Sequence, residues 1–347
     1  MRFLHTADLH LKGKDRKRME IFRWLIEEAG RLKIDYFIIA GDLFNSDTDA
    51  VILRNNLRML FKETTVKFLL VPGNHDEKSF SDEYDYGENV IQLTTEPFHI
   101  IELDKIVICA VPYQNRKFSE CIKNIPSGVD ILIAHGTLYD KSFIVSSLKE
   151  IEAEYMPIYP ANLHKKARYV ALGHFHSRSF QKEYEGVRVV YPGSPIGLDT
   201  KCDGERVFFV VEIDQTQLKI EQRVVEAAPY WQRREFFVFP GNEEQIFDKI
   251  RNHLLGIKST KIMPNIVIKG FIKESDRGFK DRLEKLEKEF QNKFPDMKFN
   301  FAEIQSWRTI IQNEVVEKFI DKSRALEDTL RQKVFEIVFP VFSKMLK

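Results

Sequence analysis

Five short apolar runs in this sequence each end directly in a cluster of polar side chains. These side chains are of the types that bind metals, and their positions limit the folds that the chain can adopt. The five clusters are Ala-Asp-Leu-His (7–10), Gly-Asp (41–42), Gly-Asn-His-Asp (73–76), Ala-His-Gly (134–136) and Gly-His-Phe-His (173–176). In α/β sheets, ligands bind in the crevice at the carboxyl ends of the strands. The pattern therefore predicts strands whose ends converge on one polar site.

The apolar runs predict eight strands, and two amphipathic stretches predict helices. Strands alternate with helices early in the chain and form hairpins later, which indicates an α/β fold of two packed sheets with helices outside. The expected strands cover residues 3–8, 36–40, 66–71, 106–111, 130–134, 169–172, 187–191 and 207–213, and the expected helices cover 16–32 and 48–61.

The pattern changes near residue 230, so we expect a second, smaller domain. Its predicted order is βαβαβ, with strands over 235–239, 266–272 and 298–304. Apolar residues recur at helical spacing from residue 312 to residue 347. This helical tail either folds back on its own core or buries its apolar face on a partner helix.

Composition narrows the class of protein. With 43% hydrophobic and 30% charged residues, the chain is typical of globular proteins. We expect no transmembrane helix and no signal peptide, and three scattered cysteines indicate a reduced, cytoplasmic protein. The net charge of +1 argues against a strongly basic nucleic-acid binder, but residues 1–225 hold 30 basic and 33 acidic side chains, and residues 226–347 hold 23 and 19.

Seven side chains in the five clusters are suited to divalent metals. Residues i and i+2 of a strand point to the same face, so Asp8 and His10 share a side, as do His174 and His176. We expect each pair to chelate one ion. Mixed imidazole and oxygen donors without a thiolate favour Mn, Fe or Zn, and they predict two adjacent ions that share a carboxylate. The seven are Asp8, His10, Asp42, Asn74, His135, His174 and His176.

This ordered set resembles the calcineurin-like metallophosphoesterase superfamily. Within it the chain most resembles the SbcD family of double-strand-break repair nucleases, the prokaryotic relatives of the meiotic-recombination-eleven nuclease. The resemblance covers the whole chain and rests on Met-Arg-Phe-Leu-His-Thr-Ala-Asp-Leu-His (1–10), Ala-Leu-Gly-His-Phe-His (171–176) and Tyr-Pro-Gly-Ser-Pro (191–195).

The resemblance implies a two-sheet metallophosphoesterase nuclease domain over residues 1–228. It also implies a DNA-binding capping domain over 229–307 and a helical segment over 308–347 that docks on SbcC, an SMC-like ATPase. The implied ions are usually Mn²⁺, and Asp42 bridges them. One ion is held by Asp8, His10, Asp42 and His176, and the other by Asp42, Asn74, His135 and His174.

The resemblance makes His75 the catalytic histidine, which is not a ligand but protonates the leaving oxygen or stabilises the transition state. Three residues past the metal aspartate, the superfamily often has Asp, and some nuclease relatives have His. This chain has Asn45 there. We expect the Asn45 side chain to orient the imidazole without adding charge, which predicts a weaker imidazolium and a slower nuclease unless Asp47 compensates.

A basic loop and an apolar helix face suggest contacts with partners. The loop begins two residues after His10, where it is well placed to hold DNA phosphates, although a solvated helix start explains it equally well. Leu53 and Leu57 either form a homodimer seam or pack against the sheet. The basic residues of the loop are Lys12, Lys14, Arg16, Lys17 and Arg18.

The predicted function is that of a Mn²⁺-dependent DNA nuclease, with exonuclease or endonuclease activity, in double-strand-break repair. It is expected to act on DNA as a homodimer together with an SbcC-type ATPase. Two alternatives remain open. One is a phosphoesterase that acts on a nucleotide or another small phosphoester and has no use for the second domain. The other is a non-catalytic adaptor that binds DNA ends, against which the complete set of seven ligands and His75 argues.

Overall fold

The computed structural model describes residues 1–81, 83–140, 155–273 and 278–345. The chain divides into two compact units, Met1–Tyr230 and Trp231–Lys347. Among the described residues, no helix is both long and apolar enough to cross a bilayer.

The first unit is built from two six-stranded sheets. The strands are β1 (Arg2–Thr6), β2 (Tyr36–Ala40), β3 (Lys67–Val71), β4 (Val90–Gln92), β5 (His99–Leu103), β6 (Ile106–Val111), β7 (Ile131–His135), β8 (Tyr169–Gly173), β9 (Phe180–Tyr184), β10 (Val187–Tyr191), β11 (Val207–Ile213) and β12 (Leu218–Val224). Their order is β12-β11-β1-β2-β3-β4 in one sheet and β5-β6-β7-β8-β10-β9 in the other. The predicted two-sheet α/β architecture is confirmed.

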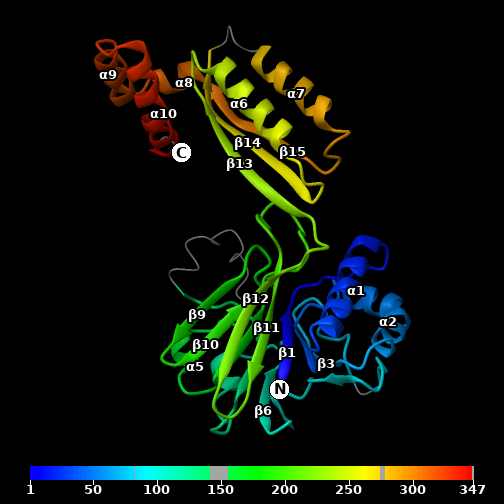
Figure 1. Ribbon diagram of the computed structural model, residues 1–347. Helices are drawn as coiled ribbons and strands as arrows, with labels where there is room; N and C mark the ends of the chain where they lie inside the picture. The colour runs from blue at the N-terminus through cyan, green and yellow to red at the C-terminus, as the bar shows by residue number, and fades with distance from the viewer. Residues whose placement is uncertain (82, 141–154, 274–277, 346–347) are drawn as a thin grey trace. The chain divides into compact units, whose positions relative to one another are not determined.

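Alternation along the strands separates three apolar layers. Side chains such as Phe3 of β1 and Ile133 of β7 lie in the core between the two sheets. The opposite side of β1, β2 and β3 is covered by α1 (Arg16–Arg31) and α2 (Asp47–Lys62), which lie beside this sheet in Figure 1. The short helices α3 (Phe118–Cys121) and α5 (Pro160–Leu163) cover the outer face of the second sheet.

The strands at the centre of each sheet run parallel. β1, β2 and β3 are parallel neighbours, and so are β6, β7 and β8. Their carboxyl ends therefore lie at one edge of each sheet, where all five polar clusters begin. All eight predicted strands are present, with ends within two residues of the expected ones, whereas the four outermost strands β4, β5, β9 and β12 were not predicted.

The burial of two leucines in α2 decides between the two roles predicted for them. Leu53 is 3% exposed and Leu57 is fully buried, and both belong to the core beneath α1 and α2. They pack against the sheet, so the expectation of a homodimer seam formed by these two leucines is wrong. The apolar residues that α2 does expose are Val51, Ile52 and Met59, at 68%, 56% and 64%.

The second unit has the predicted βαβαβ order. It comprises β13 (Tyr230–Val238), α6 (Glu243–Gly256), β14 (Ile262–Ile272), α7 (Gly278–Phe290) and β15 (Lys298–Ser306). The sheet order is β13-β14-β15, and the two helices bury one apolar face each on the sheet. Figure 1 shows α6 and α7 side by side on the sheet.

The tail forms three helices, α8 (Trp307–Ile311), α9 (Glu314–Ser323) and α10 (Asp328–Met345). One face of α10 returns to the unit's own core, where Phe339 lies 5.8 Å from Phe239 and 6.4 Å from Phe271 between ring centroids. A second set of apolar side chains remains exposed. These are Leu330 at 49%, Ile337 at 71% and Val341 at 53%. Folding back on its own core therefore accounts for only part of the apolar surface.

One polar contact joins the two sheets through their shared core. His5 of β1 is fully buried, and its Nδ1 lies 2.8 Å from the hydroxyl oxygen of Tyr169 in β8. Burial lowers the pKa of His5 to about 3. The imidazole therefore stays neutral in the folded protein across the range in which a solvated histidine becomes protonated.

We predict that His5 makes folding stability depend on pH. Between pH 6.5 and about 3 the unfolded chain binds a proton at this position and the folded chain does not, so stability falls as the pH falls. Each pH unit should cost about 1.4 kcal/mol. Denaturant unfolding between pH 7 and 4.5 should show that His5→Phe reduces this slope by one proton. Tyr169→Phe, which keeps His5 buried, should retain the slope, and equal slopes for wild type and His5→Phe would contradict the assignment.

Candidate metal centre

The loops that follow β1 and β2 run side by side and carry the first ligand candidates. The backbone amide of Asp8 donates to the carbonyl of Gly41 at 3.1 Å, and that of His10 donates to the carbonyl of Asp42 at 3.0 Å. Asp8, His10 and Asp42 have φ values of 56°, 45° and 52°. These are left-handed conformations, which are costly for residues other than glycine and concentrate at functional sites. The expectation that strand pleating aligns Asp8 with His10 is therefore wrong, because β1 ends at Thr6.

Four of the seven candidates lie together. Asp8, His10, Asp42 and His176 each offer one ligand atom within 4.8 Å of the others. The Nε2 atoms of His10 and His176 are 3.0 Å apart, and Nε2 of His176 lies 3.6 Å from Oδ1 of Asp8. This is the set that the family resemblance assigns to one ion.

The other three candidates are connected to one another through His135. Nε2 of His135 is 3.3 Å from Oδ2 of Asp42 and 3.0 Å from Oδ1 of Asn74. The His174 ring packs edge-on against His135, with centroids 5.4 Å apart. His176 belongs to the first set and His174 contacts His135, and the expectation that this pair chelates one ion stays a prediction. Asp42 is common to both groups.

The electrostatics of the cluster suit cations. Oδ2 of Asp42 is buried without a hydrogen-bond partner, and it lies 3.5 Å from Nε2 of His10 and 3.3 Å from that of His135. Although burial opposes ionisation, the His135 imidazole holds the pKa of Asp42 below its usual range. Burial lowers the pKa of His174 to about 3 and that of His176 to about 4, so both are neutral, as metal ligands must be. Although burial opposes protonation, the Asp42 carboxylate raises the pKa of His135 to about 9. A metal ion would displace this proton, because ligands are deprotonated when they bind a metal. With that proton displaced, these residues fit a pair of divalent cations.

The Gly-Asn-His-Asp cluster after β3 is locked onto Asp42. A Cβ atom on Gly73 would lie 2.1 Å from Oδ1 of Asp42, so only glycine fits there. The buried carboxylate of Asp76 accepts hydrogen bonds from the amides of Gly73 at 2.8 Å and Phe44 at 3.0 Å. It thereby ties the loop after β2 to the loop after β3. Asp76 was not among the predicted site residues, although its place in the cluster was a signal for a role.

His75 stands at the rim of the cluster. Its amide donates to Oδ1 of Asp42 at 2.9 Å, its side chain is exposed, and its ring centroid lies 4.7 Å from that of His10. Nδ1 lies 3.2 Å from the main-chain carbonyl of Asn45. Position 45 was predicted to orient the ring through its side chain. The prediction is wrong on this point, because the contact is made by the main-chain carbonyl. Asp47 accepts a hydrogen bond from the Ser79 hydroxyl at 2.6 Å.

A carbonyl accepts only from a protonated Nδ1, so the contact with Asn45 favours one arrangement of the His75 ring. In the neutral ring this tautomer carries its lone pair on Nε2, and the protonated ring can donate from Nε2. Position 45 therefore orients the ring whichever side chain it carries.

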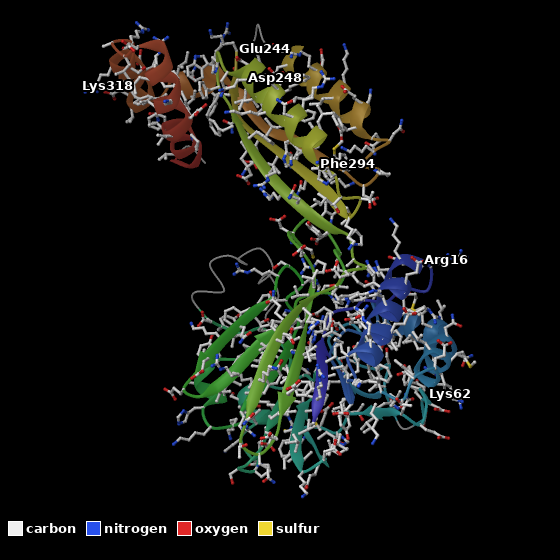
Figure 2. The ribbon with its side chains drawn as sticks, in the orientation of Figure 1. Arg16, Lys62, Glu244, Asp248, Phe294 and Lys318 are labelled. Carbon is white, nitrogen blue, oxygen red and sulfur yellow. The ribbon has the colours of Figure 1, made fainter. Side chains whose placement is uncertain are left out.

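The basic loop divides into exposed and internal residues. Lys14, Arg16 and Lys17 are exposed, and Lys12 is half-buried. Arg16 lies in the first turn of α1 (Figure 2). The Arg18 side chain is only 13% exposed, because its guanidinium binds the Asp15 carboxylate and the carbonyl of His10. Arg18 therefore points into the protein, contrary to the expectation of a DNA contact.

Comparisons with known proteins agree with this geometry. Residues 1–191 match the model of the calcineurin-like phosphoesterase family. The DNA double-strand break repair protein Mre11 of Methanopyrus kandleri is 26% identical over 67% of this chain and 58% of its own length. The SbcD subunit of the nuclease SbcCD of Escherichia coli K12 is 23% identical over 63% of this chain and 66% of its own length. The chain thus spans about six tenths of these relatives, and the resemblance found in the sequence is confirmed.

Among solved structures, TT1561 of Thermus thermophilus is 13% identical and matches 65% of this chain and 99% of its own, with a TM-score of 0.41.

We predict that removal of Asp42 empties both halves of the centre. Asp42→Ala should reduce Mn²⁺ binding from about two ions per chain to about none, whereas His176→Ala and His174→Ala should each leave about one. Isothermal titration calorimetry and Mn²⁺ electron paramagnetic resonance measure these numbers. Asn45→Ala, which keeps the main-chain carbonyl, is the matched control and should bind as wild type does. Retention of two ions by Asp42→Ala would rule out a bridging role.

Proposed function

The chain belongs to the calcineurin-like phosphoesterase family, and from that premise we propose that it is a Mn²⁺-dependent nuclease that hydrolyses phosphodiester bonds at DNA ends. The observation that carries the proposal is the buried carboxylate of Asp42, which lies between two groups of imidazole and oxygen donors. The names of the relatives, a double-strand break repair protein and a nuclease subunit, support DNA as the substrate.

Different residues of the chain have different roles in the proposed hydrolysis. The donors around Asp42 would hold two divalent ions, which supply positive charge to the attacking and the leaving oxygen of phosphoryl transfer. His75 is exposed beside these donors, where its imidazole can protonate the leaving oxygen. The Asn45 carbonyl fixes the orientation of the His75 ring. The hydrogen bond from the His75 amide to Asp42 keeps the backbone of His75 beside the carboxylate that would hold the ions.

The start of α1 supports a contact with the DNA backbone. Its first turn contains Arg16 and Lys17 and no acidic residue, and the carboxylate of its N-cap, Asp15, is already paired with Arg18. Positive side chains at the positive end of a helix are unfavourable on their own, whereas an anion there is stabilised by the amides and the dipole. A DNA phosphate held by Lys14, Arg16 and Lys17 would offset this repulsion, so we favour phosphate binding over a merely solvated helix start.

Two exposed apolar faces support protein partners. Leu330, Ile337 and Val341 recur along α10 at helical spacing, and a coiled coil of an SbcC-type ATPase would bury them. A homodimer contact would bury the exposed side chains of α2, Val51, Ile52 and Met59. With these roles, residues 1–228 are the nuclease domain, 229–307 the DNA-binding capping domain and 308–347 the docking segment. The free, buried cysteines suit a reducing cytoplasm.

We predict that His75→Ala lowers the rate of DNA hydrolysis by about 10²–10⁴-fold, because a general acid is lost, while two Mn²⁺ ions still bind. The assay follows end-labelled duplex DNA with Mn²⁺, with and without an SbcC-type ATPase. His164→Ala is the control. It removes an exposed histidine that belongs to none of the five polar clusters, and it should keep full activity.

The same assay separates the alternatives. Wild-type activity on bis-p-nitrophenyl phosphate without any DNA cleavage would favour a small phosphoester as the substrate. Binding of DNA ends without hydrolysis of either substrate would favour the non-catalytic adaptor.

We also predict that the basic residues at the start of α1 set the salt dependence of DNA binding. Lys14→Gln, Arg16→Gln and Lys17→Gln should each reduce the slope of log affinity against log salt by about 0.9, because each removes one charge that neutralises a phosphate. Fluorescence anisotropy with duplex DNA at several salt concentrations measures this slope. Lys62→Gln removes an exposed charge at the end of α2 and should leave the slope unchanged (Figure 2). A triple variant with the wild-type slope would contradict the contact.

A further inference from the structure

We infer that Arg18 and Arg206 are positioning residues whose guanidinium groups fix the two histidine ligands of one metal ion, His10 and His176, through their main-chain carbonyls. The inference rests on the proposed metal centre and adds two residues from outside its ligand motifs. Arg206 belongs to none of the polar clusters, and Arg18 was expected to bind DNA.

Arg206 lies just before β11 and is 1% exposed. Its guanidinium donates to three carbonyls: Nε to Ser194 at 3.0 Å, Nη1 to Ser177 at 3.0 Å and Nη2 to His176 at 3.1 Å. The amide of Ser194 also donates to the His176 carbonyl at 3.1 Å. The turn that carries His176 and the Tyr-Pro-Gly-Ser-Pro turn are therefore held together around one guanidinium.

The Tyr-Pro-Gly-Ser-Pro turn leaves room for this contact. Gly193 has a φ of +73°, and a Cβ atom there would lie 3.1 Å from Nη2 of Arg206. A larger residue would press on the guanidinium and on the backbone of Arg178, which lies 3.0 Å from the same point. The absence of a side chain at Gly193 thus makes room for the Arg206 guanidinium beside the His176 carbonyl.

Arg18 acts on the other histidine. Its Nη1 donates to the carbonyl of His10, and its Nε lies 2.9 Å from the carboxylate of Asp15. Asp15 is the residue that caps α1, so the guanidinium is anchored to the start of that helix. His10 has a left-handed backbone with a φ of 45°. A strained backbone persists only where its surroundings hold it, and the Arg18 contact is one such restraint.

The second group of donors is held differently. Nδ1 of His135 lies 2.9 Å from the carbonyl of Ala40, and the amide of His174 donates to the carboxylate of Asp8 at 3.0 Å. These are contacts with backbone and carboxylate groups, whereas both histidines of the first group contact a guanidinium. The difference predicts that loss of either arginine weakens one ion and spares the other.

Stability alone does not call for an arginine at position 206. Burial of a guanidinium is costly, and apolar residues of similar volume often replace buried charged groups without loss of stability. What methionine or lysine cannot reproduce is the planar fork of donors that reaches three carbonyls at fixed angles. The fork is therefore best explained by the geometry it imposes on the His176 turn.

The test measures Mn²⁺ affinity rather than turnover, with the full chain. Arg206→Met and Arg18→Met should each weaken one of two Mn²⁺ ions by about 10–100-fold and leave the other unchanged, as loss of groups that orient metal ligands does elsewhere. Titration calorimetry resolves the two affinities, and electron paramagnetic resonance should show isolated Mn²⁺ in place of a coupled pair. Arg206→Lys should recover only part of the affinity.

Arg168→Met is the matched control. Arg168 also binds carbonyls, those of Asp214 and Gln217, and it lies at the start of β8 rather than at the end that leads to the ligands. It should keep both affinities. Arg18→Met replaces a partly exposed side chain rather than a fully buried one, and it keeps the test decisive if Arg206→Met fails to fold.

Equal weakening of both ions, or wild-type affinities in Arg18→Met and in a folded Arg206 variant, would overturn the inference. A wild-type chain that binds no pair of ions would instead overturn the proposed metal centre.

Discussion

The buried carboxylate of Asp42 is the contact on which the polar edge of the first unit depends. A buried charge is tolerated only with partners, and Asp42 gathers them from separate strand ends: the amide of His75 and the imidazoles of His10 and His135. The loops after β1, β3 and β7 therefore cannot be placed independently of one another. The orphaned Oδ2 marks what the protein alone leaves incomplete, and a pair of divalent cations would complete it.

The central strands were predictable because they are buried on both faces. β2, β7 and β8 have no exposed residue, so each appears in the sequence as an uninterrupted apolar run. The missed strands β4, β5, β9 and β12 are the four edges of the two sheets. Each contains no fully buried residue, and β5 and β9 alternate between exposed and half-buried side chains. An edge strand is defined by its hydrogen-bonding neighbour, which a local apolar pattern does not reveal.

The site was predictable in its residues and not in its geometry. Short motifs identified the ligand types, because chemistry limits which side chains bind metals. The backbone that presents them was not predictable, since Asp8 and His10 converge through left-handed conformations that sequence does not require of them. Contacts between distant segments were equally hidden. Arg206 meets His176 only after β11 joins the sheet, and position 45 acts through a carbonyl that every residue has.

The near-neutral charge acquires a different meaning once the residues are placed. Arg18 and Arg206 count toward the 53 basic side chains, yet the protein's own carbonyls occupy their guanidinium groups. Such bonds limit the access of a ligand to these two groups. The long-range field is weak for another reason: residues 1–225 hold 30 basic and 33 acidic side chains, and two divalent ions would outweigh this small acidic excess. Attraction for a phosphate backbone must therefore be local, at the ions and at the start of α1. Under the proposed function, DNA would be bound mainly at the site of cleavage, and partner proteins would supply the remaining affinity.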